Sequence, residues 1–168
     1  MAKAWRVVKT DYIATALSGD GARRAGGRWN PAGTPALYAS DSLALAMLEV
    51  LVHFDPAMPM ADYVAFELDL PDDKILTLKP AALPGAWPGR DSIPLTQQMG
   101  KGWLGARSAF AIRVPSAVVG QEGNFIINPA HPDFAAWLPR QLARAPVPLC
   151  FDPRLVARRA TASGNKSL

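Results

Sequence analysis

GGRWNPAGTPALYASDSLALAMLEVLVH, residues 26–53, joins a constrained loop, a short strand and a helix in one continuous segment. Its first two glycines permit turns that other residues resist, and the prolines at 31 and 35 stiffen the chain that follows. We therefore expect a long loop over residues 18–35 that presents Arg28.

The second half of this segment predicts a strand that runs into a helix. Residues 36–39 form the strand, and Ser40-Asp41-Ser42 offers side-chain oxygens that cap a helix N-terminus. The helix begins near Leu43 and ends at Phe54, since the next residue precedes a proline and avoids helical backbone. Its apolar residues cover the whole circumference, which is typical of a buried helix.

The rest of the chain predicts further short elements. Residues 63–70, YVAFELDL, alternate between apolar and mostly acidic positions as a half-buried strand does. More strands are expected at residues 5–8, 109–114 and 124–127, and Pro94 suits the first turn of a helix. The pattern predicts an α+β fold in a single domain, with a small, mostly antiparallel sheet and a few helices. The P-loop motif and the regular βαβ rhythm of a doubly wound fold are absent from the sequence.

Composition and charge narrow the class of protein. The chain has 168 residues, of which 49% are hydrophobic and 19% charged, so one domain with a real core is expected. The net charge is +4, but four of the 18 basic residues lie in the last fifteen positions, which contain no acid. The other 14 balance the 14 acidic residues, so we expect no direct binding of nucleic acid.

Cysteine use and hydropathy point to a cytoplasmic protein. Cys150 is the only cysteine, which excludes an internal disulfide and a cysteine-based zinc site. The N-terminus lacks the apolar core of a secretory signal, and the longest apolar run is too short to span a bilayer. We expect a soluble cytoplasmic protein that does not associate with membranes.

Glu49 is the exception on an otherwise apolar helix. A desolvated, unpaired carboxylate costs several kcal/mol, so Glu49 is either bonded to a neighbouring element or lines a pocket. His53 lies four residues further on, on about the same helix face. Two such residues do not make a metal site, so no metal is expected and His53 is interpreted as a capping or core histidine.

Arg28 and Tyr38 are candidates for binding a ligand. The planar fork of an arginine matches phosphate or carboxylate oxygens two at a time, although a surface ion pair would also explain Arg28. Tyr38 ends the strand that leads into the Glu49 helix and could stack on a flat ring or pack in the core. Trp29 is interpreted as a core anchor.

Three later polar residues complete the candidate set. Ser116 follows a predicted strand in VPSAVV, where its hydroxyl can face a cleft, but a partnering Asp/His pair and GxSxG are absent. Asn124 and Asn128 stand at opposite ends of a short strand with even spacing, which places them on one face. Capping of turns is the alternative role for both.

These motifs together resemble the RES domain family, which is named for an arginine, a glutamate and a serine. Arg28, Glu49 and Ser116 appear in the same order here. The resemblance rests on the segment 26–53 and extends to WR at 5–6, VPSAVV at 114–119, NFIINPAHP at 124–132 and FDPRL at 151–155. It covers a RES domain over residues 1–155 and leaves residues 156–168 as a basic, flexible tail.

The resemblance implies a toxin of a type II toxin–antitoxin pair with an Xre-like antitoxin as its partner. It implies a fold similar to that of ADP-ribosyltransferases, with NAD as the substrate. Arg28 would hold a phosphate of NAD, Tyr38 would stack near the nicotinamide ring and Glu49 would contact the nicotinamide ribose. Ser116 would line the same pocket, with Asn124 and Asn128 in the matching late motif.

Three functions remain open at this point. The chain could consume NAD by hydrolysis or phosphorolysis of the nicotinamide–ribose bond, or it could transfer ADP-ribose to a protein target. Both reactions break the same bond, so residues 26–53 do not separate them. The third is a binding module without activity, in which Arg28 and Glu49 form a structural ion pair.

Overall fold

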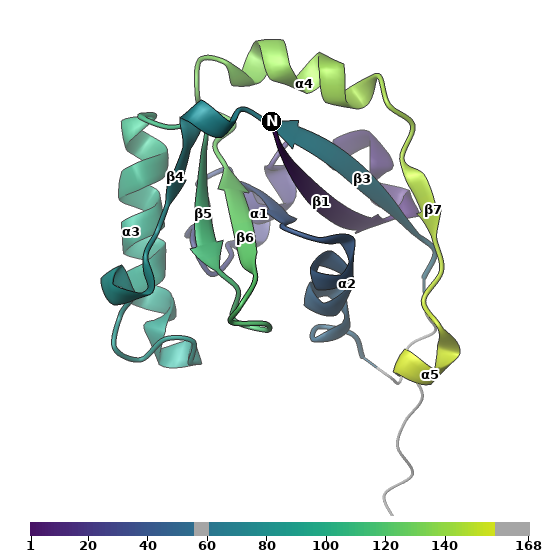
Figure 1. Ribbon diagram of the computed structural model, residues 1–168, viewed down its shortest axis with the longest axis horizontal. Coiled ribbons are helices and arrows are strands. Elements are labelled where there is room, and N and C mark those ends of the chain that lie inside the picture. The colour runs from purple at the N-terminus through teal and green to yellow at the C-terminus, as the bar shows by residue number, and fades with distance from the viewer. Residues whose placement is uncertain (56–60, 157–168) are drawn as a thin grey trace, which may run out of the picture.

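A computed structural model describes residues 1–55 and 61–156 (Figure 1). In these ranges the strands form one sheet of seven in the order β4-β5-β6-β2-β1-β3-β7. The strands are β1 (Ala2–Lys9), β2 (Leu37–Ser40), β3 (Tyr63–Leu70), β4 (Ile75–Thr77), β5 (Ala111–Pro115), β6 (Gly123–Ile127) and β7 (Val147–Leu149). The helices are α1 (Asp20–Ala25), α2 (Leu43–Leu51), α3 (Ile93–Ala106), α4 (Phe134–Leu142) and α5 (Pro153–Val156). Short 3-10 turns span Thr10–Thr15, Asp72–Lys74, Pro80–Ala82 and Arg90–Ser92.

The predicted α+β class is confirmed, with one addition to the sheet. Every neighbouring pair of strands is antiparallel except β4 and β5, which are parallel and are joined through α3. This single βαβ crossover was not expected, because β4 is only three residues long and has no alternating pattern of its own.

The sheet separates two cores, because side chains along a strand alternate between its faces. On β2 and β6, Leu37, Phe125 and Ile127 join the larger core, which α4 covers with Phe134 and Trp137. Tyr38 and Ile126 face the opposite way and pack with Trp29 and Leu104 of α3. The second face therefore meets both α3 and the loop that contains Arg28.

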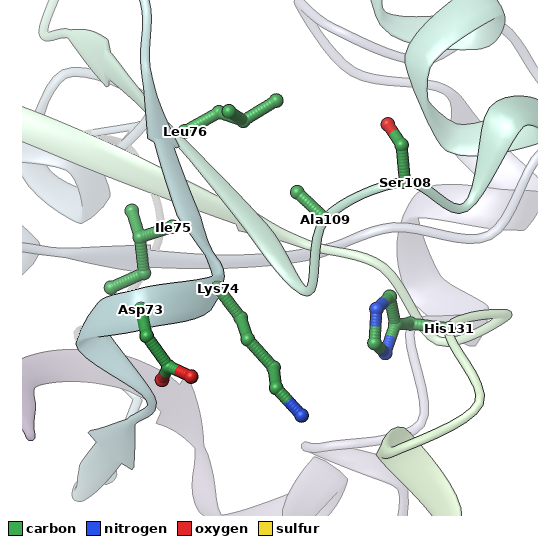
Figure 2. Close-up of a pocket in the computed structure, with 7 residues that line it drawn as sticks. All are labelled: Asp73, Lys74, Ile75, Leu76, Ser108, Ala109 and His131. Atoms are coloured by element: carbon green, nitrogen blue, oxygen red, sulfur yellow. The ribbon is translucent and has the colours of Figure 1, made fainter.

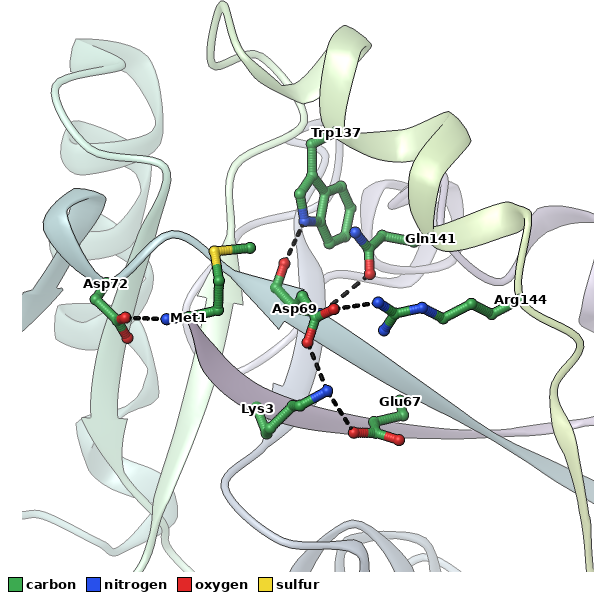
Figure 3. Close-up of polar contacts among 8 residues, drawn as sticks. All are labelled: Met1, Lys3, Glu67, Asp69, Asp72, Trp137, Gln141 and Arg144. Atoms are coloured by element: carbon green, nitrogen blue, oxygen red, sulfur yellow. Dashed lines mark hydrogen bonds and ion pairs between the residues drawn. The ribbon is translucent and has the colours of Figure 1, made fainter.

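Asp69 of β3 fastens α4 to the sheet (Figure 3). Its backbone N–H donates to Gln141 Oε1 at 3.0 Å, and its carbonyl accepts from the Trp137 indole at 2.6 Å. Its carboxylate pairs with Arg144 and with Lys3, and these two cations, Arg144 first, hold the pKa of Asp69 below its ordinary value. The acidic positions of β3 are thus used in contacts rather than left in water.

The strand at 63–70 has the predicted bounds, but its burial is greater than its pattern indicates. Val64, Phe66, Leu68 and Leu70 are buried as expected. Tyr63 and Ala65 on the other face are buried as well. Phe151 packs edge-on to Tyr63, and the 3-10 turn Thr10–Thr15 lies against β3.

The predicted loop over residues 18–35 is wrong in part, because it contains α1. Gly19 at φ 79° precedes this helix and Gly26 at φ 73° follows it, so the glycines punctuate a helix rather than replace it. Arg28 and its neighbours occupy the loop that remains.

Helix α2 departs from its prediction in length and in burial. Ser42 is the N-cap and accepts from the Leu45 N–H at 3.0 Å, as expected. The helix ends at Leu51 rather than Phe54, and only Leu45 and Ala46 are buried along it. Leu48 is 38% exposed, so the expectation of a helix buried on all sides is wrong. The helix is short and packs mainly on β1 and β2, so apolar residues elsewhere around it stay partly exposed.

Helix α3 begins as predicted, with Pro94 in its first turn, and it approaches the 26–31 loop closely at Gly100. A Cβ at Gly100 would collide with the backbone carbonyl of Trp29, whereas a Cβ at Gly102 would meet open space. No helix in the described ranges has the length and apolar character needed to cross a membrane.

Because its added methyl group would collide with the Trp29 carbonyl, Gly100→Ala should destabilise the protein by about 1–3 kcal/mol, the usual cost of overpacking. Gly102→Ala, two residues further along the same helix, should stabilise it by up to about 1 kcal/mol through helix propensity. Urea unfolding of both variants measures the difference. Equal effects of the two alanines would contradict the close contact at Gly100.

Candidate active site

Glu49 is held by two donors from outside its helix. Ser116 donates its hydroxyl to Glu49 Oε1 at 2.9 Å, and Asn124 donates its amide to the same oxygen at 2.5 Å. In the part of the chain that the structure describes, no donor bonds Oε2 and no cation pairs with Glu49. The carboxylate is half-buried, oriented through one oxygen and open at the other.

Ser116 orients Glu49 and has no hydrogen-bonding capacity left for other work. A serine hydroxyl offers one donor and two acceptor positions. The donor goes to Glu49, and the acceptor positions receive the N–H groups of Val118 at 3.0 Å and Val119 at 3.1 Å. The side chain is 2% exposed. Ser116 therefore fixes the carboxylate and is unsuited to act as a nucleophile.

Asn124 is fixed by a register contact between β2 and β6. Ser40 lies directly opposite Asn124 in the sheet and donates its hydroxyl to Asn124 Oδ1 at 2.7 Å. This bond assigns the other amide atom as the nitrogen, which faces Glu49. The sequence pointed to Ser40 only as a candidate helix cap, because its role here depends on a strand pairing that joins residues 84 positions apart.

Tyr38 lies on the same sheet face as Asn124. Tyr38 is paired with Ile126 on β6, and Asn124 lies two residues before Ile126. Residues two apart on a strand share a face, so Tyr38, Ser40 and Asn124 line one side of the sheet. The Tyr38 backbone carbonyl accepts from Arg6 Nη1 at 2.8 Å. The sequence pointed to Arg6 only as part of the WR motif and did not predict that it supports Tyr38.

The Tyr38 hydroxyl fixes the 26–31 loop. It accepts from the Trp29 N–H at 3.0 Å and donates to Asn30 Oδ1 at 2.7 Å. A Cβ on Gly27 would lie 2.7 Å from this hydroxyl, so the second glycine is required for space. Asn30, which the sequence did not single out, is fully buried and also bonds the carbonyls of Ala22 and Thr34.

Burial raises the pKa of Tyr38 from 10.0 to about 12. The folded protein therefore keeps this proton to a higher pH than the unfolded chain, so the stabilisation is present below pH 10 and is lost as pH rises toward 12. Between pH 8 and pH 11 the unfolding free energy should fall by about 1.4 kcal/mol more in the natural protein than in Tyr38→Phe. Urea unfolding at both pH values tests this, and parallel losses in the two proteins would refute it.

Arg28 projects from the fixed loop without an acidic partner among the described residues. Its Nη1 donates long bonds to the Gly89 carbonyl at 3.4 Å and to Ser92 Oγ at 3.5 Å. Its guanidinium lies 5.2 Å from the ring centroid of Trp87. These contacts are weak for an arginine, so the guanidinium retains capacity for an anionic group.

Trp29 packs in the core, as predicted. It is 4% exposed, and its ring lies 5.7 Å from that of Trp87 with a tilt of 46°. Trp87 thus contacts two residues of the 26–31 loop: the ring of Trp29 and the guanidinium of Arg28, which lies over it.

Asn128 and His53 lie apart from the Glu49 cluster. Asn128 is buried, donates to the Leu104 carbonyl at 2.9 Å and accepts from the Ala130 N–H at 2.9 Å. It is four residues from Asn124, about 13 Å along a strand, so the structure does not join it to Glu49. His53 is exposed beyond the end of α2, so the core alternative is wrong and the capping alternative stays a prediction.

Two cavities lie elsewhere in the described chain. The larger, about 300 Å³, is lined by Lys74, Ser108 and His131 among others (Figure 2). A smaller one of about 180 Å³ lies between α3 and the sheet and includes Trp29 and Trp103. Neither is lined by Glu49, so the assignment of the candidate site rests on the oriented carboxylate and not on cavity size.

Comparisons with known proteins bear on this arrangement. Residues 3–152 match the RES domain. The chain belongs to the RES domain family. This RES domain is 35% identical to Toxin Res of Yersinia enterocolitica over 151 residues, which cover 90% of this chain and 97% of that protein. It is 34% identical to the Prs ADP-ribosylating toxin of a Sphingobium species, with 92% and 96% covered.

A solved structure has the same fold. It is the toxin–antitoxin complex MbcT–MbcA of M. tuberculosis, whose matched chain is 25% identical, with a TM-score of 0.67. The match covers 92% of this RES domain and 86% of that chain. In the present RES domain the serine and the glutamate are bonded to each other, and the arginine stands on the adjoining loop.

Proposed function

We propose that this RES domain is the toxin of a toxin–antitoxin pair and that it breaks the nicotinamide–ribose bond of NAD. The observation that carries the chemistry is Glu49, which Ser116 and Asn124 orient through one oxygen, while the other has no hydrogen-bond donor among the described residues. The relatives named Toxin Res and Prs ADP-ribosylating toxin support both parts of the proposal.

The reaction requires little acid catalysis. The bond between ribose C1′ and the ring nitrogen breaks with its electron pair, which leaves nicotinamide as a neutral molecule. Positive charge develops on the sugar, and the partly desolvated carboxylate of Glu49 stabilises it. An acceptor oxygen or nitrogen then bonds C1′ and releases its proton.

Arg28 supplies the binding contact in this proposal. Its fork matches the diphosphate of NAD, which would replace the long bonds to Gly89 and Ser92 with short, charge-assisted ones. Tyr38 fixes the loop through its hydroxyl, and in this proposal its ring stacks near the nicotinamide. Positioning of this kind lowers the barrier without any further chemical group.

Product analysis tests the proposal and identifies the acceptor. The purified protein is incubated with NAD in three reactions: with buffer alone, with phosphate, and with cell lysate and labelled NAD. Free nicotinamide with ADP-ribose indicates hydrolysis, and a phosphorylated ADP-ribose indicates phosphorolysis. If folded protein leaves NAD intact in all three reactions, the proposal is wrong.

Transfer of ADP-ribose to a protein is the second candidate. The name of the Sphingobium relative favours it, and the same Glu49 arrangement serves it, because only the acceptor differs. A labelled protein band in the lysate reaction identifies transfer, whereas hydrolysis and phosphorolysis leave the label on small molecules.

The third function, an inactive binding module, required an ion pair between Arg28 and Glu49. Among the described residues the two make no such pair and take different partners. The proposed partner protein is an Xre-like antitoxin, in keeping with the matched structure, which is a toxin–antitoxin complex. Co-expression with the antitoxin should relieve growth arrest caused by the toxin alone.

A further inference from the structure

Part of the candidate site stands on a hairpin that extends beyond its neighbouring strand. The pairing of β2 with β6 ends where Ser40 lies opposite Asn124. The β5–β6 pair continues past this point to Pro115 and Gly123, and the turn between them carries Ser116. Ser116, one of the two residues that hold Glu49, therefore lies outside the ladder between β2 and β6, whereas Asn124 lies at its end.

Asp41 holds this hairpin to the start of α2. Its backbone N–H donates to the Gly123 carbonyl at 2.9 Å, and its Oδ2 accepts from the Gly123 N–H at 2.7 Å. Arg113 of β5 grips the same carboxylate with two nitrogens, Nε at 2.9 Å from Oδ1 and Nη2 on Oδ2. A Cβ on Gly123 would lie 2.6 Å from this guanidinium, so the contact leaves no room for another side chain.

Glu122 adds a second link between the helix and the hairpin. The N-cap Ser42 donates its hydroxyl to Glu122 Oε2 at 2.6 Å while it accepts from the first turn of α2. The Glu122 backbone carbonyl accepts from the Ser116 N–H at 2.9 Å. Glu122 thus links the N-cap residue of α2 to the backbone of Ser116, the serine that orients Glu49.

The main packing of α2 is on strands outside the hairpin. Leu45 and Ala46 are its buried residues, and β1 and β2 are the strands that it packs on most. Polar contacts connect α2 to the hairpin at both ends, through Asp41 and Ser42 at the first and Glu49 at the second.

We propose that Asp41, Arg113 and Glu122 are positioning residues that keep the Glu49 carboxylate aligned with the reacting sugar. The inference rests on the proposed function and names residues that act through Glu49. Because misplacement of a reacting group by about 1 Å can cost about 100-fold in rate, loss of this clamp should appear in kcat.

Arg113→Gln tests the clamp. It removes the two-nitrogen grip, and we expect kcat for NAD consumption to fall between about 10- and 100-fold while KM changes by less than about threefold. Arg113→Lys restores a single charged bond and should recover part of the rate. Asp41→Asn, which keeps an oxygen for the Gly123 N–H, should reproduce the loss if Arg113→Gln fails to fold.

Arg144→Gln is the matched control. It breaks a comparable pair with Asp69 on the β3–α4 side of the sheet and should leave kcat unchanged. An unchanged kcat in Arg113→Gln, a change confined to KM, or an equal loss in Arg144→Gln overturns the proposal.

A second measurement does not depend on activity. The Asn124 side-chain amide, bonded to Glu49 at 2.5 Å, gives an NMR signal that is assigned by its absence from Asn124→Ser. Arg113→Gln should move this signal toward the position of a free amide, and Arg144→Gln should not. If the natural protein leaves NAD intact, the proposed function fails while this signal still tests the clamp, and an unmoved signal overturns it.

Discussion

Glu49→Gln is expected to reduce NAD turnover by at least about 100- to 1,000-fold, the usual cost of removing one electrostatic contact to a transition state. The glutamine oxygen can still accept from Ser116 and Asn124, so the hydrogen bonds that orient the side chain survive. Its amide nitrogen replaces the free oxygen and presents a partial positive charge to a sugar that is becoming positive. The measurement is kcat from nicotinamide release.

The controls for Glu49→Gln check that the variant still folds and binds NAD, and that loss of a different carboxylate has no effect. Thermal unfolding and NAD affinity of Glu49→Gln should remain close to those of the natural protein, because shape and contacts are kept. Glu67 of β3 is a partly exposed carboxylate that pairs with Lys3 of β1, and Glu67→Gln should leave turnover intact. Retention of full turnover by Glu49→Gln would remove Glu49 from the mechanism.

Arg28→Ala is expected to raise KM for NAD by about 10- to 150-fold, the range given by losing a hydrogen bond to a charged group. The effect should fall on KM because the diphosphate, the group that we propose Arg28 binds, does not react, so the arginine would bind ground state and transition state alike. Initial rates over a range of NAD concentrations separate KM from kcat.

Arg24→Ala serves as the comparison, since Arg24 is an exposed residue of α1 four positions earlier. It removes the same charge from the same region and should change KM by less than about twofold through screened electrostatics. A similar rise in both variants would show that Arg28 contributes only general charge.

The elements predicted best were those with a local signal. The period-two pattern gave the bounds of residues 63–70, Ser42 was found as a cap, and Pro94 as a helix start. Helix α1 was missed because its flanking glycines suggested an uninterrupted loop, and β4 and β7 because three residues carry too little pattern.

The candidate site was predictable as a set of residues but not as an arrangement. Ser116 and Asn124 lie 67 and 75 positions from Glu49. The contact of Asn124 depends on the register of β6 against β2, and that of Ser116 on the turn between β5 and β6. The polarity of a helix face predicted that Glu49 needs partners, since a desolvated carboxylate is costly. The helix pattern did not indicate which strands supply the partners of Glu49. It also did not indicate which elements cover α2, so the exposure of α2 was misjudged.

The close approach of Gly100 to Trp29 has a consequence for how this protein responds to heat. Glycines usually mark segments that loosen before the rest, yet here the Arg28 loop is wedged between α3 and the Tyr38 hydroxyl. The loop therefore cannot loosen by itself, and it should become disordered only when the whole domain unfolds. On warming, affinity for substrate should persist up to the melting temperature and then be lost together with the fold.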